Sequence, residues 1–163
     1  MITAFPIKQS FEEKSEDMNY IEFKTIINSI KKEKPVLFQL SKDKTVLDET
    51  VDTSEEYYGV KFPDSYRVFL KELGGGYLGF LLIFSLDKDG MFYLQDHISV
   101  DFVDEAGMLP VIDLETGDYI GYKIADGICK EKMVIWLHEE REIRDLNKGF
   151  YEIVLERGFN ISN

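Results

Sequence analysis

The hydrophobic pattern of this chain changes its period at the glycine run 74–76. Before the glycines, apolar residues recur every three or four positions, which is the spacing of one face of an α-helix. After them, apolar runs are short and separated by turn residues, which is typical of strands, and a helical pattern returns after Asn147. The sequence therefore predicts an α+β fold, a mostly antiparallel sheet with N-terminal helices and a C-terminal helix packed on it.

Three helices are expected before the glycine run. The first covers about residues 19–32 and places one apolar stripe toward a core. The second ends at Gly59, because glycine accepts the left-handed conformation of a C-terminal cap at no steric cost. The third begins at Pro63 and is stopped by Gly74. We expect the apolar run 36–40, between the first two helices, to be extended.

Strands are expected after the glycine run, at residues 78–86, 91–95, 109–113, 119–124 and 132–137. The first two should form a hairpin, because Asp87 and Gly90 bound a turn between them. The closing helix begins near Phe150. Trp136 lies on the strand that we expect to be most buried, so the sequence favours a core position for it, with pocket lining as the alternative.

The length of 163 residues fits a single domain, residues 1–163, that buries about 70% of its unfolded surface without crosslinks. A lone Cys129 cannot form an internal disulfide. No apolar run approaches the 18 residues of a membrane span, so no membrane insertion is expected. The N-terminus lacks the pattern of a secretory signal, and a cytoplasmic location is therefore expected.

The formal net charge of −12 argues against direct nucleic-acid binding, because a phosphate backbone must be neutralised by cations. The acidic excess is concentrated in the middle of the chain, where ten acids between Asp87 and Asp126 face only two lysines. Such a stretch forms either a solvated surface or a docking surface for a basic protein. The candidate partner-binding residues are Asp87, Asp89, Asp101, Asp104, Glu105 and Asp118.

Familiar ligand motifs are incomplete in this sequence, and we expect no cofactor and no metal. The glycines at 74, 76 and 79 match a dinucleotide pattern, but they follow a helix where that site needs them to precede one. A calcium loop counted from Asp87 has Ile98 where its bidentate glutamate belongs. One cysteine and two histidines lack zinc-ligand spacing.

Catalytic constellations are also missing, so no catalytic residues and no enzymatic activity are expected. No serine has the flanking glycines of a nucleophile elbow. Cys129 and His138 could pair as a reactive thiolate and its cation. The simpler interpretation of Cys129 is a small packing residue at the start of an apolar strand.

An ordered series of motifs resembles the signature of the SUKH superfamily, of the Smi/Knr type named after a yeast regulator of cell-wall glucan synthesis. Its central part is YGVKFP at residues 58–63, followed by Tyr66, Phe69, Leu70 and the glycines 75 and 76. Downstream, the resemblance continues at residues 109–111, 117–118, 133–136 and 150–155. It covers about residues 21–155.

This resemblance implies an α+β domain without catalytic residues. It implies either an immunity protein that neutralises a co-encoded bacterial toxin, often a nuclease, or a regulatory module that binds an endogenous protein. The acidic composition agrees with a basic toxin domain as partner. A third hypothesis is a small-molecule binder with a pocket beside residues 74–79 and Trp136. The oligomeric state is left open.

Overall fold

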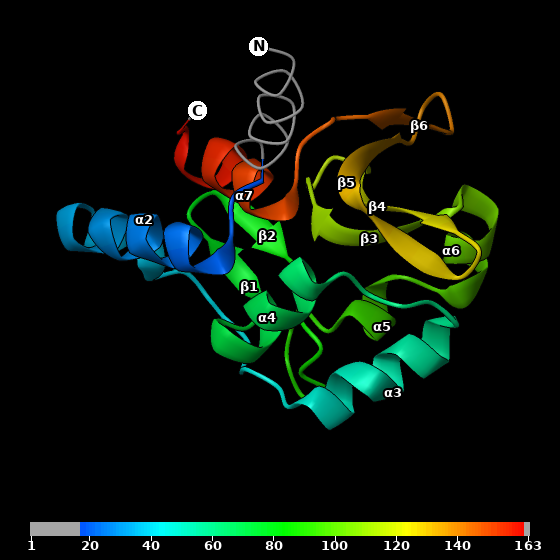
Figure 1. Ribbon diagram of the computed structural model, residues 1–163, viewed down its shortest axis with the longest axis horizontal. Helices are drawn as coiled ribbons and strands as arrows, with labels where there is room; N and C mark the ends of the chain where they lie inside the picture. The colour runs from blue at the N-terminus through cyan, green and yellow to red at the C-terminus, as the bar shows by residue number, and fades with distance from the viewer. Residues whose placement is uncertain (1–16, 162–163) are drawn as a thin grey trace, which may run out of the picture.

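The computed structural model describes residues 17–161 and is built around one six-stranded sheet (Figure 1). Each strand pairs antiparallel with the next one along the chain, so the sheet is a meander from β1 to β6. The strands are β1 (Gly76–Leu78), β2 (Leu81–Ile83), β3 (Met108–Asp113), β4 (Tyr119–Ala125), β5 (Ile128–Leu137) and β6 (Glu142–Asp145).

Helices precede the sheet, interrupt it after β2 and close it. They are α2 (Tyr20–Glu33), the 3-10 helix η1 (Pro35–Phe38), α3 (Asp48–Tyr58), α4 (Asp64–Glu72), α5 (Leu94–His97), α6 (Val100–Ala106) and α7 (Phe150–Phe159). The predicted α+β class is confirmed, with helices on the N-terminal side of the sheet and a C-terminal helix packed against β2 and β5. Within residues 17–161, no helix combines the length and apolar character that crossing a bilayer requires.

Local signals explain where the predicted helices begin and end. The Asn19 side chain accepts a hydrogen bond from the Glu22 amide at 2.9 Å and so caps α2. Gly59 ends α3 in the left-handed conformation, with φ of 70°, as predicted. At the start of α7, the Gly149 amide donates to the Glu152 carboxylate.

Helices cover both faces of the sheet. On one face, Tyr122 of β4 meets Phe150 of α7, and Phe150 packs edge-on against Phe69 of α4 with ring centroids 5.2 Å apart. Tyr119, three residues earlier on β4, projects to the opposite face because side chains alternate along a strand. There it contacts Phe102 of α6. The two faces therefore carry different helices, α4 and α7 on one and α6 on the other (Figure 1).

The predicted hairpin between residues 78–86 and 91–95 is wrong. The chain reverses earlier, so that Leu78 and Leu81 pair across β1 and β2. The carboxylate of Asp43 then holds the following loop, because it accepts hydrogen bonds from the Ser85 hydroxyl at 2.6 Å and the Phe92 amide at 2.8 Å. These donors are satisfied by a residue more than forty positions away, which turn residues alone cannot indicate.

Four further elements differ from the sequence-based expectations. The run 36–40 is not extended, since Pro35 begins a 3-10 helix there, and proline suits the first turn of a helix. Helix α6 and strand β6 were not predicted. Strand β5 begins at Ile128, earlier than expected, because the Lys61 carbonyl accepts a hydrogen bond from the Cys129 amide and anchors its first residues.

Candidate protein-binding surface

Helix α6 carries three of the six predicted partner-binding residues. The Ser99 hydroxyl caps the helix by accepting from the Phe102 amide at 3.1 Å. Asp101, Asp104 and Glu105 are all exposed on this helix. Among residues 17–161, no ion pair involves any of these three carboxylates. Their charges are therefore available to another molecule.

Two of these acids occupy an unfavourable position. Asp104 and Glu105 lie in the last turn of α6, which holds no basic residue. The C-terminal end of a helix carries partial negative charge, so carboxylates there oppose helix stability. Residues that oppose local stability are expected at functional surfaces.

A row of apolar side chains crosses the sheet beside α6. Trp136 of β5 lies directly opposite Tyr119 of β4 on one side and Ile143 of β6 on the other. Directly opposed residues project from the same face. Phe102 of α6 packs edge-on against both aromatic rings, at centroid distances of 5.7 Å to Tyr119 and 5.3 Å to Trp136.

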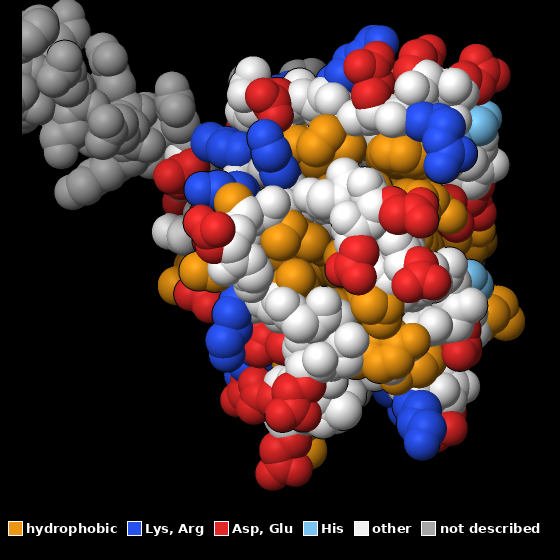
Figure 2. Space-filling view, turned by 90° about the vertical axis from the view of Figure 1, so that its right-hand side faces the viewer, with side chains coloured by type: hydrophobic (Ala, Val, Ile, Leu, Met, Phe, Trp, Pro, Cys, Tyr) orange, Lys and Arg blue, Asp and Glu red, His pale blue; other side chains and the backbone are white. Residues whose placement is uncertain are grey.

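A groove of about 310 Å³ opens between α6 and the β5–β6 turn. It is lined by Phe102, Glu105, Ala106, Trp136, Arg141, Glu142 and Ile143. Figure 2 shows the side of the molecule on which α6 lies, where hydrophobic side chains are exposed with acidic side chains beside them. Trp136 is half-buried and lines this groove, so the favoured expectation of a core position is wrong and the alternative holds.

Carboxylates and guanidinium groups both lie around the groove. Glu105 and Glu142 contribute carboxylates, and Arg144 donates to the Glu142 carboxylate at 2.9 Å. Arg141 lies at the turn and is the groove's own cationic side chain. Over residues 17–161, the cations found above aromatic rings lie on Phe38 and Phe69, and none lies on Trp136.

Asp118 is tied to a histidine. Its carboxylate accepts from the His138 amide at 2.9 Å and lies 2.6 Å from the His138 ring Nδ1. The backbone and side-chain hydrogen bonds from His138 hold the pKa of Asp118 below its usual value. The hydrogen bond to Asp118 in turn raises the pKa of His138. This predicted partner-binding residue therefore has a structural role, joining the start of β4 to the end of β5.

Asp87 and Asp89 lie in the turn after β2, apart from α6 in the chain. The Asp87 carboxylate accepts from the Lys44 amide at 3.0 Å and from the Asp89 amide at 3.1 Å, so it shapes the turn. Asp89 is exposed. The predicted acidic set is thus divided among three structural settings, and only α6 brings three of its members together.

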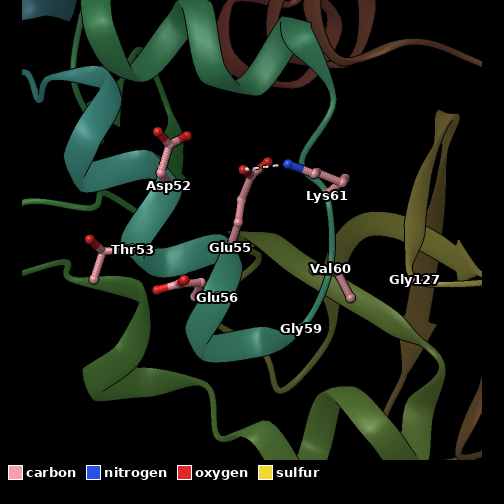
Figure 3. Close-up of a pocket in the computed structure, with 8 residues that line it drawn as sticks. All are labelled: Asp52, Thr53, Glu55, Glu56, Gly59, Val60, Lys61 and Gly127. Carbon is pink, nitrogen blue, oxygen red and sulfur yellow. Dashed lines mark ion pairs between the residues drawn. The ribbon is translucent and has the colours of Figure 1, made fainter.

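A second pocket, of about 400 Å³, lies between the end of α3 and the β4–β5 turn (Figure 3). Its lining is formed by Asp52, Thr53, Glu55, Glu56, Gly59, Val60, Lys61 and Gly127. Glu55 is only 7% exposed and points toward Lys61, whereas Asp52 and Glu56 project away from it. The walls are acidic and open to solvent.

The buried acid of this second pocket is fully used by the fold. Glu55 accepts from the Phe62 amide at 2.7 Å and pairs with Arg67 at 3.0 Å. Lys61 lies 3.8 Å away. Because both oxygens already face donors, this carboxylate joins α3, the following extended segment and α4.

The proposed thiolate pair of Cys129 and His138 is wrong. Cys129 is buried, and desolvation raises the pKa of its thiol to about 12. Cys129 lies near the start of β5 and His138 directly follows its last residue. Cys129 therefore packs in the core. Across residues 17–161, no group of three or more histidine, cysteine or acidic residues is placed to hold a metal ion.

The glycine run is filled by the protein's own chain. A Cβ atom added at Gly75 would lie 2.6 Å from Ser85, and one at Gly76 would lie 2.6 Å from the Lys42 Cα. The groove at Trp136 is formed by other residues. The small-molecule hypothesis is therefore wrong in placing the glycines and Trp136 in one pocket.

The fold and this surface define an α+β domain that presents free carboxylates beside an exposed aromatic groove. A family model described as SMI1-KNR4 cell-wall, SUKH_6, matches residues 48–152, which is more than half of the chain. The chain therefore belongs to the SUKH superfamily, as its motifs indicated. The matched residues run from the start of α3 into α7 and include α6 and the whole sheet. A comparison with curated proteins found no match.

Proposed function

We propose that this chain is a non-catalytic protein-binding domain that acts as an immunity protein and neutralises a co-encoded bacterial toxin. The observation that carries this proposal is the α6 surface, where Asp101, Asp104 and Glu105 form no ion pair within residues 17–161 and Glu105 lines the groove at Trp136. Protein interfaces combine a few aromatic anchors with a polar rim, and this surface offers both.

Charge supports a basic partner. A toxin that cuts nucleic acid binds phosphates through basic residues, so its binding face attracts a domain of net charge −12. Complementary charge accelerates association and excludes wrong partners, while the buried anchors supply affinity. We expect a one-to-one complex whose association slows as salt is added.

The test is the survival of a bacterial host that expresses the upstream gene product, with and without this chain from a second plasmid. We expect the neighbour to reduce viable counts and this chain to restore them. Reversing Asp101, Asp104 and Glu105 to lysine should abolish rescue. The matched control reverses Glu22, Glu33 and Glu72, exposed acids of α2 and α4, and should keep it.

The two parts of the proposal fail separately. A harmless neighbour, or a lethal one that this chain does not relieve, contradicts the immunity role. Equal rescue by both triple variants contradicts α6 as the interface. Association rates measured by surface plasmon resonance at about 0.05 and 0.5 M salt then show whether any charged surface steers the complex.

A second candidate function is an intracellular regulatory or scaffold module that binds an endogenous protein. The cell-wall description of the matching family model favours it. This function predicts no toxin gene beside the chain's own gene. It also predicts that deletion of the gene changes cell-wall composition or resistance to wall-active antibiotics, which an immunity protein without its toxin would leave unchanged.

A further inference from the structure

The groove beside α6 has the composition of a site for a planar cation. One wall is the aromatic pair Phe102 and Trp136, and Glu105 of α6 lines the groove beside them. A purely apolar occupant would cover the Glu105 carboxylate without giving it a partner, which opposes binding. A cation that stacks on the aromatic surface and also donates hydrogen bonds would satisfy both kinds of wall.

We propose that this groove binds an arginine side chain of the partner protein, with its guanidinium stacked on Trp136 and donating to Glu105. The proposal rests on the proposed protein-binding function and names the chemistry of the partner's anchor. Charge complementarity selects this occupant, because the acids of α6 adjoin the groove and none of them is paired within residues 17–161.

Arginine suits this groove better than lysine. Its guanidinium is planar, is weakly hydrated and can donate to a carboxylate while it stacks on a ring. The lysine ammonium is a compact, strongly hydrated point charge that makes poorer contact with an aromatic face. The groove should therefore distinguish the two cations and not merely attract positive charge.

The arginine that lines the groove gives the proposal a second prediction, of opposite sign. Arg141 lines the groove and repels an entering cation, so its removal should strengthen binding. Glu142 alternates with Ile143 along β6, so its carboxylate projects to the other face of the sheet, where Arg144 donates to it. A surface that attracted cations only through the net charge of the protein would respond equally to a charge substitution at any exposed position.

Trp136 is the chain's single tryptophan, so its fluorescence reports on the groove directly. The probe is an acetylated tetra-arginine peptide amide, compared with tetralysine and with neutral tetracitrulline. We expect saturable change with tetra-arginine, at a concentration several-fold lower than with tetralysine, and no change with tetracitrulline. The response should weaken as salt is raised.

Substitutions test whether the fluorescence change arises from binding in the groove. Glu105→Gln should weaken tetra-arginine binding about fivefold, and Arg141→Gln should strengthen it about threefold. The matched control, Glu22→Gln with Glu33→Gln on α2, should stay within twofold. Because Trp136 variants lose the fluorescent signal, their binding is followed through the Ile143 amide resonance. Trp136→Phe should retain part of the affinity and Trp136→Leu should lose it.

Equal responses to arginine and lysine peptides, or arginine binding that survives both Glu105→Gln and Trp136→Leu, overturn the proposal. A Trp136 response without rescue of the host retains the arginine site and contradicts the immunity role. Rescue that depends on the α6 acids, without any arginine response at Trp136, retains the interface and overturns the arginine anchor.

Discussion

Carboxylates have two kinds of surroundings in this protein. Glu55 is 7% exposed and faces the Phe62 amide, Arg67 and Lys61. The acids of α6 are exposed and face solvent. A buried acid with several donors maintains the fold, whereas an exposed and unpaired one can be changed without loss of contacts. Substitutions in the two groups should therefore separate stability from binding.

Removing the Glu55 carboxylate should destabilise the protein strongly. Glu55→Ala leaves the Phe62 amide without its acceptor and Arg67 without its buried partner, and we expect a loss of about 2–3 kcal/mol. Urea unfolding followed by circular dichroism measures it. Glu56→Ala, the adjacent exposed residue, is the control and should stay within about 0.5 kcal/mol. Equal losses would show that helix propensity, not the buried acid, decides the effect.

The pair of Asp118 and His138 should make stability depend on pH. The raised pKa of His138 means that its contribution is complete below the ordinary value of 6.5 and is lost as pH rises through the higher folded value. The lowered pKa of Asp118 means that its contribution is present above 3.8 and is lost as pH falls through the folded value. The pair should therefore stabilise most between these limits.

Asp118→Asn tests this dependence. The difference in thermal midpoint between wild type and variant should be largest near pH 5.5 and smaller at pH 8.5. The pKa of His138, followed by NMR, should fall in the variant toward 6.5. A difference that is constant between pH 5 and 9 would contradict the charged pair.

The β1–β2 turn and the end of α7 approach each other closely. Gly79 has φ of 60°, and a Cβ atom there would lie 2.1 Å from the carbonyl oxygen of Gly158. The neighbouring Phe80 amide donates to that same oxygen at 2.9 Å. This contact fixes the position of the last helix against the first hairpin.

Gly79→Ala should therefore cost about 3 kcal/mol or more, because backbone strain and a clash with main-chain atoms add together. Gly107→Ala is the matched control, since Gly107 has φ of 70° but open space around its Cα. It should cost about 1 kcal/mol. Denaturant midpoints measure both changes, and equal losses would mean that conformation alone, without the contact to α7, requires glycine.

Elements with strong local signals could be predicted from the sequence, and elements fixed by distant contacts could not. The helices with clear periodicity and caps, α2 through α4 and α7, were found. The loop held by Asp43 was missed, because its hydrogen bonds come from far along the chain. Helix α6 carried a usable signal, Ser99 before it and Gly107 after it, that was not recognised. Without α6 and β6, the groove at Trp136 could not be predicted.

The negative charge of this protein opposes its own stability at the scale of the whole molecule. A net charge of −12 repels itself, and the last turn of α6 adds carboxylates to the negative end of a helix. Proteins commonly sacrifice some stability where a surface has another use.

Neutralising these acids should accordingly stabilise the protein. Asp104→Asn with Glu105→Gln should raise the free energy of unfolding by about 0.3–1 kcal/mol at low salt. Asp101→Asn, in the first turn of the same helix, should lower the free energy of unfolding by about 0.3 kcal/mol, because an acid is favourable there. Both differences should shrink in 1 M salt. Destabilisation by the double variant would reveal internal partners for these acids.

The meander order of the sheet affects how the chain folds during synthesis. Successive strands pair as they appear, so most of the sheet can assemble from neighbouring segments. Helix α7 comes after every strand, yet Phe150 packs against Tyr66 and Phe69 of α4. The aromatic side of α4 therefore lacks part of its cover on the ribosome until α7 emerges, and a nascent chain is prone to aggregate while apolar surface is exposed.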